Sequence, residues 1–199
     1  MKIVLASGSP RRKEILENMN LKFDIIKSEI DETTMDNESP CDLVKRLSYE
    51  KAYDVATKNT ESIVIGADTV VVLDNNVLGK PRNKEEAFNM LKQMSGKEHE
   101  VITGISILCL ETKKEISDFC VSKVKFKNLS DDDIYSYIET GECMDKAGSY
   151  GIQGIGALLV EYIKGDYFNI VGFPISSASE IFKKDFDIDL FKLNRGKFI

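Results

Sequence analysis

An aspartate interrupts a strongly apolar run between residues 63 and 73. The run reads IVIGADTVVVL, and Asp68 is its one charged residue. A carboxylate in such surroundings is costly unless it is paired with a cation or binds a metal. Asp68 therefore indicates a functional site, with room for a ligand beside Gly66 and Ala67. The alternative is a strand-end aspartate that only caps a neighbouring backbone group.

Two arginines follow a turn of small residues near the N-terminus. Residues 7–12 read SGSPRR after the apolar run at residues 3–5, which predicts a buried strand, a tight loop and a helix that starts at Pro10. The free N–H groups of a helix start favour an anion, whereas cations there are unfavourable on their own. Arg11 and Arg12 therefore indicate an external anion in the loop, or else two solvated side chains on a capped helix.

Three weaker sequence features supply further candidate site residues: carboxylates, lysines and an amide. Residues 29–32 read EIDE, and clustered carboxylates suit Mg²⁺, although such a loop is more often only solvated. Lys51 interrupts the apolar face of a predicted helix, and Lys80 stands between a glycine and a proline; both could be ordinary surface lysines. Gln153 offers a donor and an acceptor for a nucleobase edge, among glycines that a ligand could approach closely, or it belongs to a plain glycine-rich turn.

Together these residues supply cations for phosphates, carboxylates for a metal and an amide for a base. Two known nucleotide-binding sequences are absent: the chain has no G-x-x-x-x-G-K-[ST], and no G-x-G-x-x-G after a strand. Its net charge is −6, with 27 Lys and Arg against 33 Asp and Glu. This acidic balance argues against binding a nucleic-acid polymer, but not against a small anion held where a few basic side chains converge.

The composition is that of an ordinary globular protein. The 199 residues, 42% of them hydrophobic, are enough for one sizeable core. The four cysteines match no zinc or redox spacing, so we expect reduced thiols. The one histidine, His99, cannot build a multi-histidine zinc site and is expected at the surface or a strand edge. No apolar run is long enough for a signal peptide or a membrane span, which predicts a soluble cytoplasmic protein with no membrane partner.

Hydrophobic periodicity predicts alternating strands and helices. Helices are expected to begin at Pro10, Pro40, Asn83, Ser130 and Pro174. Strands are expected at residues 3–5, 23–26, 63–73, 101–110, 116–126 and 158–163, with a loop at 29–39, a hairpin turn at 74–76 and a loose tail after Asp189. Elements alternate at both ends with a long hairpin between them, which predicts a mixed α/β sheet in a single domain over residues 1–199.

Six short pieces of sequence occur in a specific order. They are ASGSPRR at 6–12, RL at 46–47 with EKA at 50–52, GADTVV at 66–71, LGKPR at 78–82, MSG at 94–96 and DKAGSYGIQG at 145–154. In this order they resemble the Maf-like nucleoside triphosphate pyrophosphatase family, in particular its branch that acts on dTTP and UTP. The similarity covers nearly the whole chain. Thr69 after the aspartate looks like this branch, whereas the branch acting on 7-methyl-GTP typically has glutamine there.

The resemblance implies a fold and a set of site residues. The fold is an α/β structure with a bent mixed β-sheet flanked by helices and two lobes around a cleft, similar to inosine triphosphatase. Asp68 falls on the catalytic carboxylate of the family. The substrate-discriminating positions are Arg11, Thr69 and Gln153. The positions expected to bind phosphate or metal are Ser7, Arg12, Glu32, Lys51 and Lys80. A homodimer is expected by resemblance alone.

The implied reaction is hydrolysis of dTTP or UTP, with modified pyrimidine nucleotides as further candidates, to the monophosphate and pyrophosphate. Glu32 and Asp68 would position Mg²⁺ or Mn²⁺, with Glu29 and Asp31 as alternatives to Glu32, and Asp68 would orient or deprotonate the attacking water. The rival hypothesis is a regulator of cell division and septum formation that binds a nucleotide without cutting it. Asp68 separates the two, since a pure binder has no need of a buried carboxylate facing the triphosphate.

Overall fold

The computed structural model of the chain describes residues 2–33, 35 and 38–193. The chain divides into two compact units. Unit 1 comprises residues 1–68, 103–120 and 172–199, and unit 2 comprises residues 69–102 and 121–171. The single domain expected over residues 1–199 stays a prediction.

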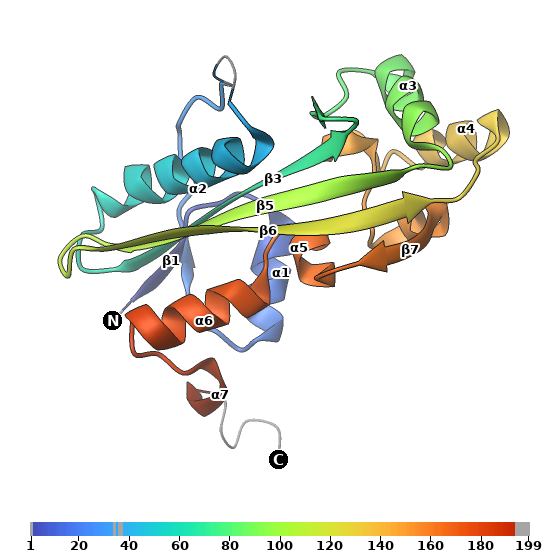
Figure 1. The fold of residues 1–199 in the computed structure, drawn as a ribbon. Coiled ribbons are helices and arrows are strands. Elements are labelled where there is room, and N and C mark those ends of the chain that lie inside the picture. The colour runs from blue at the N-terminus through green and yellow to red at the C-terminus, as the bar shows by residue number, and fades with distance from the viewer. Residues whose placement is uncertain (1, 34, 36–37, 194–199) are drawn as a thin grey trace. The chain divides into compact units, whose positions relative to one another are not determined.

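Seven strands form one mixed sheet (Figure 1). They are β1 (Ile3–Leu5), β2 (Asp24–Ile25), β3 (Ile63–Leu73), β4 (Asn76–Leu78), β5 (Glu98–Cys109), β6 (Lys114–Phe126) and β7 (Val160–Lys164). The hydrogen-bonded order is β2-β1-β3-β5-β6-β7, with β4 paired to β3. β1 runs parallel to β2 and β3, whereas β4 is antiparallel to β3 and β7 is antiparallel to β6. The predicted mixed α/β sheet is confirmed.

The longer helices begin close to the predicted positions. They are α1 (Pro10–Asn18), α2 (Pro40–Ala56), α3 (Lys84–Met94), α4 (Asp131–Glu139) and α6 (Ile175–Asp185). The side chains of Ser39, Asn83 and Ser130 each accept a hydrogen bond from the backbone N–H three residues further on, which fixes the start of α2, α3 and α4. Ser9 makes no such cap at α1; its N–H donates instead to Ser7 Oγ at 3.2 Å.

Several short elements were not predicted. They are the helices α5 (Tyr167–Val171) and α7 (Leu190–Leu193), and the 3₁₀ helices η1 (Ala147–Ser149) and η2 (Gly154–Leu159). Helices of three to six residues contain too few repeats for a periodic signal. The tail expected to be loose after Asp189 therefore begins with α7, where Leu190 is buried.

In unit 1 the strands lie between helices. α2 covers one face of the strands and α6 covers the other (Figure 1). Small residues of α2, among them Ala52 and Ala56, share a buried cluster with Val4 of β1 and Val64 of β3. The predicted apolar stripe of α2 is thus the side that meets the sheet.

Two glycines let α2 lie directly against the sheet. A Cβ at Gly66 of β3 would stand 2.1 Å from the Ser48 carbonyl oxygen, and a Cβ at Gly104 of β5 would stand 2.1 Å from the Val44 carbonyl oxygen. Both contacts are with helix backbone, which cannot rotate away as a flexible side chain can. The interpretation of Gly66 as room for a ligand is therefore wrong, because α2 fills that space.

Gly66→Ala is expected to destabilise the protein by about 3 kcal/mol, because the added methyl group must push the α2 backbone away from β3. Urea unfolding followed by circular dichroism measures the change. Gly79→Ala is the matched control, since a Cβ at Gly79 would meet no heavy atom of the described residues within 4 Å apart from its own chain neighbours, and its expected effect is below about 0.5 kcal/mol. Equal free energies of unfolding for the two variants would show that α2 is not seated this closely.

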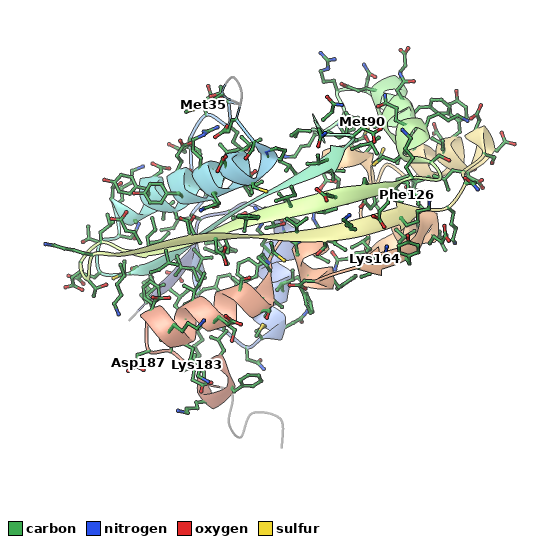
Figure 2. All side chains as sticks on the ribbon, in the orientation of Figure 1. Met35, Met90, Phe126, Lys164, Lys183 and Asp187 are labelled. Carbon is green, nitrogen blue, oxygen red and sulfur yellow. The ribbon has the colours of Figure 1, made fainter. Side chains whose placement is uncertain are left out.

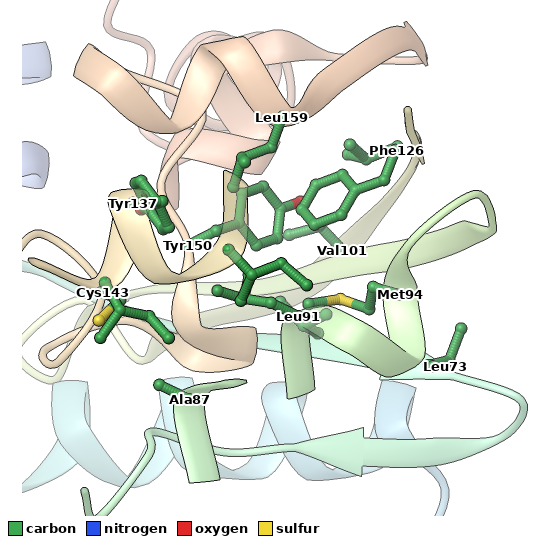
Figure 3. Close-up of a cluster of buried hydrophobic side chains, with 14 of the residues drawn as sticks. Leu73, Ala87, Leu91, Met94, Val101, Phe126, Tyr137, Cys143, Tyr150 and Leu159 are labelled. Atoms are coloured by element: carbon green, nitrogen blue, oxygen red, sulfur yellow. The ribbon is translucent and has the colours of Figure 1, made fainter. Parts of the chain in front are cut away.

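Unit 2 has a hydrophobic core of its own (Figure 3). Leu91 and Met94 of α3 lie there with Phe126 of β6, which is also labelled in Figure 2, and with Tyr137 of α4 and Tyr150. The rings of Phe126 and Tyr150 meet edge to face, with 4.7 Å between their centroids. This core fixes Tyr150, the residue at which the glycine-rich sequence 150–154 begins.

His99 is buried in the same core, at 2% exposure, so the expected surface position is wrong. Its ring packs edge to face on Phe126 and Tyr150, and its Nε2 lies 2.8 Å from Tyr150 Oη. The flanking Glu98 and Glu100 made the segment look exposed, but alternate residues of a strand point to opposite faces. Burial lowers the pKa of His99 to about 4, against the charge of Glu98, which raises it.

Acidification below pH 6.5 is expected to destabilise the protein through His99. The ordinary pKa of histidine is 6.5 and the folded value is about 4, so between these values the unfolded chain binds a proton that the folded chain does not. The stability present above pH 6.5 is lost as the pH falls towards 4, by about 3 kcal/mol in total. Urea unfolding at pH 7 and pH 4.5 should show a larger loss for the natural chain than for His99→Gln. Equal losses would contradict this assignment.

Cys41, Cys109, Cys120 and Cys143 are all thiols in this structure, and the reduced state expected from the sequence stays a prediction. Across the described residues, the helices are all too short or too polar to traverse a lipid bilayer.

Candidate active site

Three parallel strands of unit 1 bring candidate residues to one edge of the sheet. Val4 of β1 is paired with Asp24 of β2 on one side and with Val64 of β3 on the other. The carboxyl ends of parallel strands meet at the same edge, which is where α/β sheets bind ligands. Ser7 follows β1, the acidic segment (residues 29–33) follows β2, and Asp68 lies in β3 beyond its pairing with β1.

Lys51 joins two carboxylates in unit 1. Its Nζ lies 2.6 Å from Asp68 Oδ1 and 2.9 Å from Glu32 Oε1. The side chains of Lys51 and Asp68 are 11% and 10% exposed, whereas that of Glu32 is 56% exposed. Lys51 belongs to the buried side of α2, where it interrupts the apolar pattern because it meets Asp68. The buried carboxylate is therefore paired with a buried cation, as its surroundings require.

Arg12 is a second buried cation in unit 1. Its Nε donates to the Gly172 carbonyl oxygen at 2.8 Å, and its Nη1 donates to Ser7 Oγ at 3.1 Å. Burial lowers the pKa of Arg12, while the negative charges of Asp68 and Glu32 raise it. Because Arg12 responds to both carboxylates, it belongs to the same electrostatic group.

The residues brought together in this way will be called the unit 1 cluster: Ser7, Arg12, Glu32, Lys51 and Asp68. Arg11 is half-buried beside Arg12 in the first turn of α1. The cluster combines two cations and a hydroxyl, which bind phosphate oxygens, with two carboxylates, which bind a metal or accept a proton. This is chemistry suited to an anionic substrate that carries a metal.

The other predicted site residues belong to unit 2. Thr69 follows Asp68 in β3 and is half-buried. Lys80 is exposed after β4, and Gln153 is half-buried at the start of η2. Their roles stay predictions.

Sequence analysis missed two residues that hold candidate segments in place. In unit 1, Arg46 of α2 binds the chain just after Glu32, through the Thr33 carbonyl oxygen at 2.9 Å. In unit 2, the Glu142 carboxylate accepts hydrogen bonds from the N–H groups of Ile155 and Gly156, at 3.1 and 3.4 Å, two and three residues after Gln153. Arg46 lies in one of the six matched pieces of sequence, but it is four residues before Glu50. That spacing predicts an ordinary ion pair on a helix surface, so it gave no sign of a further role. Nothing in the sequence marked Glu142.

The donor set of the unit 1 cluster fits a divalent metal bound together with a phosphate. The Lys51 ammonium lies between oxygens of Asp68 and Glu32, so two carboxylates already converge on one positive charge. Within the part of the chain that the structure describes, no three His, Cys, Asp or Glu side chains gather to hold a metal by themselves. Mg²⁺ commonly takes one or two carboxylates and completes its shell with waters and substrate phosphates. Mn²⁺ accepts the same oxygen ligands.

Comparison with known proteins decides the family. A family model described as Maf-like protein matches residues 2–185. The chain belongs to the Maf family. The resemblance inferred from six short pieces is thereby confirmed over nearly the whole chain.

Relatives of this Maf protein share about half or more of its residues. A protein of Clostridioides difficile named dTTP/UTP pyrophosphatase is 60% identical over 191 residues, which cover 96% of this chain and 98% of that protein. A protein of the same name from Thermoanaerobacter sp. is 52% identical, over 96% of this chain and 100% of that protein.

Two solved structures are much more distant matches. The Staphylococcus aureus Ham1 protein has a TM-score of 0.48 and 15% identity, with 81% of each chain covered. A nucleoside-triphosphatase, or dITP/XTP pyrophosphatase, from Mycobacterium abscessus has a TM-score of 0.43 and 12% identity, over 65% of this chain and 76% of that one.

Proposed function

We propose that this Maf protein is a nucleoside triphosphate pyrophosphatase that converts dTTP and UTP to the monophosphate and pyrophosphate. One observation carries the proposal: a buried carboxylate, Asp68, lies in the same cluster as Lys51 and Arg12. Cations alone would be enough to hold a triphosphate, whereas a buried carboxylate among them gives the site a group that can activate water. The name dTTP/UTP pyrophosphatase of relatives at 60% and 52% identity supports the same activity.

In the proposed reaction, water attacks the α-phosphorus of the nucleotide. A bond forms between the water oxygen and phosphorus, the bond from phosphorus to the α,β-bridging oxygen breaks, and that oxygen leaves with pyrophosphate. Asp68 orients the water and accepts its proton. Arg12 and Lys51, with Arg11 and Lys80, stabilise the negative charge on the leaving pyrophosphate, and Ser7 donates its hydroxyl to a phosphate oxygen.

Glu32 and Asp68 would hold Mg²⁺ or Mn²⁺. Such an ion, when bound with the triphosphate, neutralises phosphate charge and makes a bound water more acidic. Glu32 is preferred over Glu29 and Asp31 because its carboxylate lies beside the same ammonium group as Asp68. The carboxylates also keep Lys51 in place while the substrate is absent.

The choice of nucleotide is assigned to Thr69 and Gln153. Gln153 can donate and accept hydrogen bonds at a pyrimidine edge, and Glu142 caps the backbone two and three residues after it. A site that hydrogen-bonds its substrate rejects analogues that leave those groups unpaired. We therefore propose a preference for dTTP and UTP over purine nucleotides.

A pyrophosphate-release assay tests the function. The purified protein is incubated with dTTP, UTP, dCTP, dATP, dGTP, 7-methyl-GTP and modified pyrimidine triphosphates, with and without Mg²⁺ or Mn²⁺. Rapid release of pyrophosphate from dTTP and UTP with metal is expected. Tight nucleotide binding without release would support the rival hypothesis of a division regulator, and fast cleavage of 7-methyl-GTP would place the protein in the other branch.

A homodimer belongs to the same proposal and rests on resemblance alone. A cytoplasmic location belongs to it as well, as the prediction made from the apolar runs of the sequence. Light scattering from the protein as it leaves a sizing column would test the dimer. Cell fractionation would test the location.

A further inference from the structure

Helix α2 holds the acidic segment at more than one point. Residues 29–33 lie in an irregular stretch ahead of α2, and their candidate metal ligand, Glu32, has a 56% exposed side chain. An exposed side chain on an irregular segment samples many positions unless its backbone is fixed. The contacts between this segment and α2 therefore decide how often Glu32 lies near Asp68.

Arg46 fixes the end of the segment. Its Nη2 donates to the Thr33 carbonyl oxygen at 2.9 Å. The same guanidinium binds Glu38 through both carboxylate oxygens, at 2.6 and 2.7 Å, and Glu50 at 3.1 Å. Planar two-point pairing of this kind gives geometric specificity that a lysine does not provide. The hydrogen bonds with Glu38 are the largest cause that raises the pKa of Arg46, so the guanidinium stays charged.

Glu38 makes a further contact, beyond the end of the segment. Its Oε2 accepts a hydrogen bond from the N–H of Met35 at 3.4 Å. Met35, labelled in Figure 2, is 58% exposed, so its position depends little on apolar packing. A polar contact with Glu38, and not apolar packing, therefore holds the backbone N–H of Met35.

Asp54 fixes the start of the segment, two turns further along α2. Its Oδ2 accepts a hydrogen bond from the backbone N–H of Glu29 at 3.0 Å. This hydrogen bond is the largest cause that lowers the pKa of Asp54. Lys51, between the two anchors on the same helix, binds Glu32 itself. The segment is thus bound at both ends and in the middle by one rigid element.

We propose that Arg46 and Asp54 are positioning residues that hold Glu32 beside the Lys51 ammonium that also contacts Asp68, where both carboxylates would bind the divalent metal. Neither residue contacts the reacting atoms in this assignment. The inference rests on the proposed function, because it takes Glu32 as a metal ligand. Outer partners of metal ligands typically contribute 10- to 100-fold in metal affinity.

The test measures Mn²⁺ binding directly, by electron paramagnetic resonance of the free ion, with a dTTP analogue whose α,β-bridging oxygen is a methylene group. Arg46→Gln is expected to weaken Mn²⁺ binding about 10- to 100-fold. Arg46→Lys, which keeps the charge but loses the two-point pairing, is expected to weaken it as well. Lys184→Gln, which breaks an exposed i,i+4 pair with Glu180 in the same unit, is the control and should bind as the natural chain does.

The direction of the change in Mn²⁺ affinity distinguishes a positioning role of Arg46 from a simple effect of its charge. Removing the positive charge of Arg46 would by itself strengthen the binding of a free cation but weaken the binding of the anionic nucleotide. Weaker Mn²⁺ binding therefore indicates lost geometry when Arg46→Lys, which keeps the charge, shows it as well. In dTTP turnover, we expect the Mn²⁺ concentration for half-maximal rate to rise by the same factor, while kcat at saturating metal stays within about threefold. A change in kcat alone would point to a different role.

Natural affinity for Mn²⁺ in both Arg46 variants would overturn the inference while leaving the proposed function intact. If Arg46→Gln fails to fold, Arg46→Lys and Glu38→Gln, which removes one carboxylate oxygen from the same pairing, decide the question. If the natural chain releases no pyrophosphate but binds Mn²⁺, the function fails and the positioning role is still measured. If the natural chain binds no Mn²⁺ with the analogue, the role of Glu32 fails.

Discussion

Asp68→Asn is expected to lower kcat for dTTP on the order of 10²–10⁴-fold, the usual contribution of a general base. The amide has the same shape as the carboxylate but cannot accept the proton of the attacking water. Lys51 keeps its second partner, Glu32, at 2.9 Å, so the ammonium is not left without a carboxylate. The variant should therefore fold and still bind nucleotide. Pyrophosphate release measured under saturating dTTP and Mg²⁺ gives the change in kcat.

Asp24→Asn is the matched control for this substitution. Asp24 is also ion-paired, to Lys2 at 2.6 Å, but its side chain is 57% exposed. Its replacement should leave kcat within about twofold, because exposed ion pairs contribute little. A well-folded Asp68→Asn protein that turns over dTTP like the natural chain would remove the catalytic role of Asp68.

Lys51→Met is expected to lower the free energy of unfolding by about 3–5 kcal/mol in the absence of metal. The Asp68 side chain is 10% exposed and loses the ammonium 2.6 Å away. A buried carboxylate without its cation is the costly case, whereas replacing both partners by neutral groups is much less so. Methionine keeps the length of the apolar stem, so lost packing contributes little. Urea unfolding at pH 7 measures the effect.

The double variant Lys51→Met with Asp68→Asn separates charge from packing. It should regain most of the stability that Lys51→Met loses, because no uncompensated carboxylate is left in the core. If Lys51→Met costs less than about 1 kcal/mol, or if the second substitution restores nothing, the pair is not the buried ion pair described above.

Sequence reasoning found the residues whose chemistry conflicts with their surroundings. Asp68 interrupts an apolar strand, and Lys51 interrupts the apolar face of a helix. Both charges are tolerated in these buried places because each compensates the other. Arg12 was found for a similar reason, since cations at the start of a helix oppose its dipole. Such conflicts are visible in one sequence without any structure.

The contacts of residues that do not interrupt the local sequence pattern could not be predicted. Arg46 and Glu142 bind backbone groups 13 or 14 residues away in the chain, and only the folded path of the chain brings them there. His99 lies between two glutamates, and its burial depends on Phe126 and Tyr150, which come from distant parts of the sequence. Gly66 was recognised as special, but for a ligand and not for the helix that occupies its place.

The seating of α2 on Gly66 and Gly104 has a consequence for the precision of the site. Lysine has a long side chain with many rotamers, so the position of its ammonium group is ordinarily poorly defined. Here the carbonyl groups of Ser48 and Val44 lie over Gly66 and Gly104, which have no side chains. A shift of the helix along its own axis would press these carbonyl groups against the side chains that flank the two glycines. The contact between the backbone of α2 and the backbone of the strands therefore fixes the position of the helix along its axis. Because Lys51 belongs to α2, the same contact fixes where its side chain starts relative to Asp68.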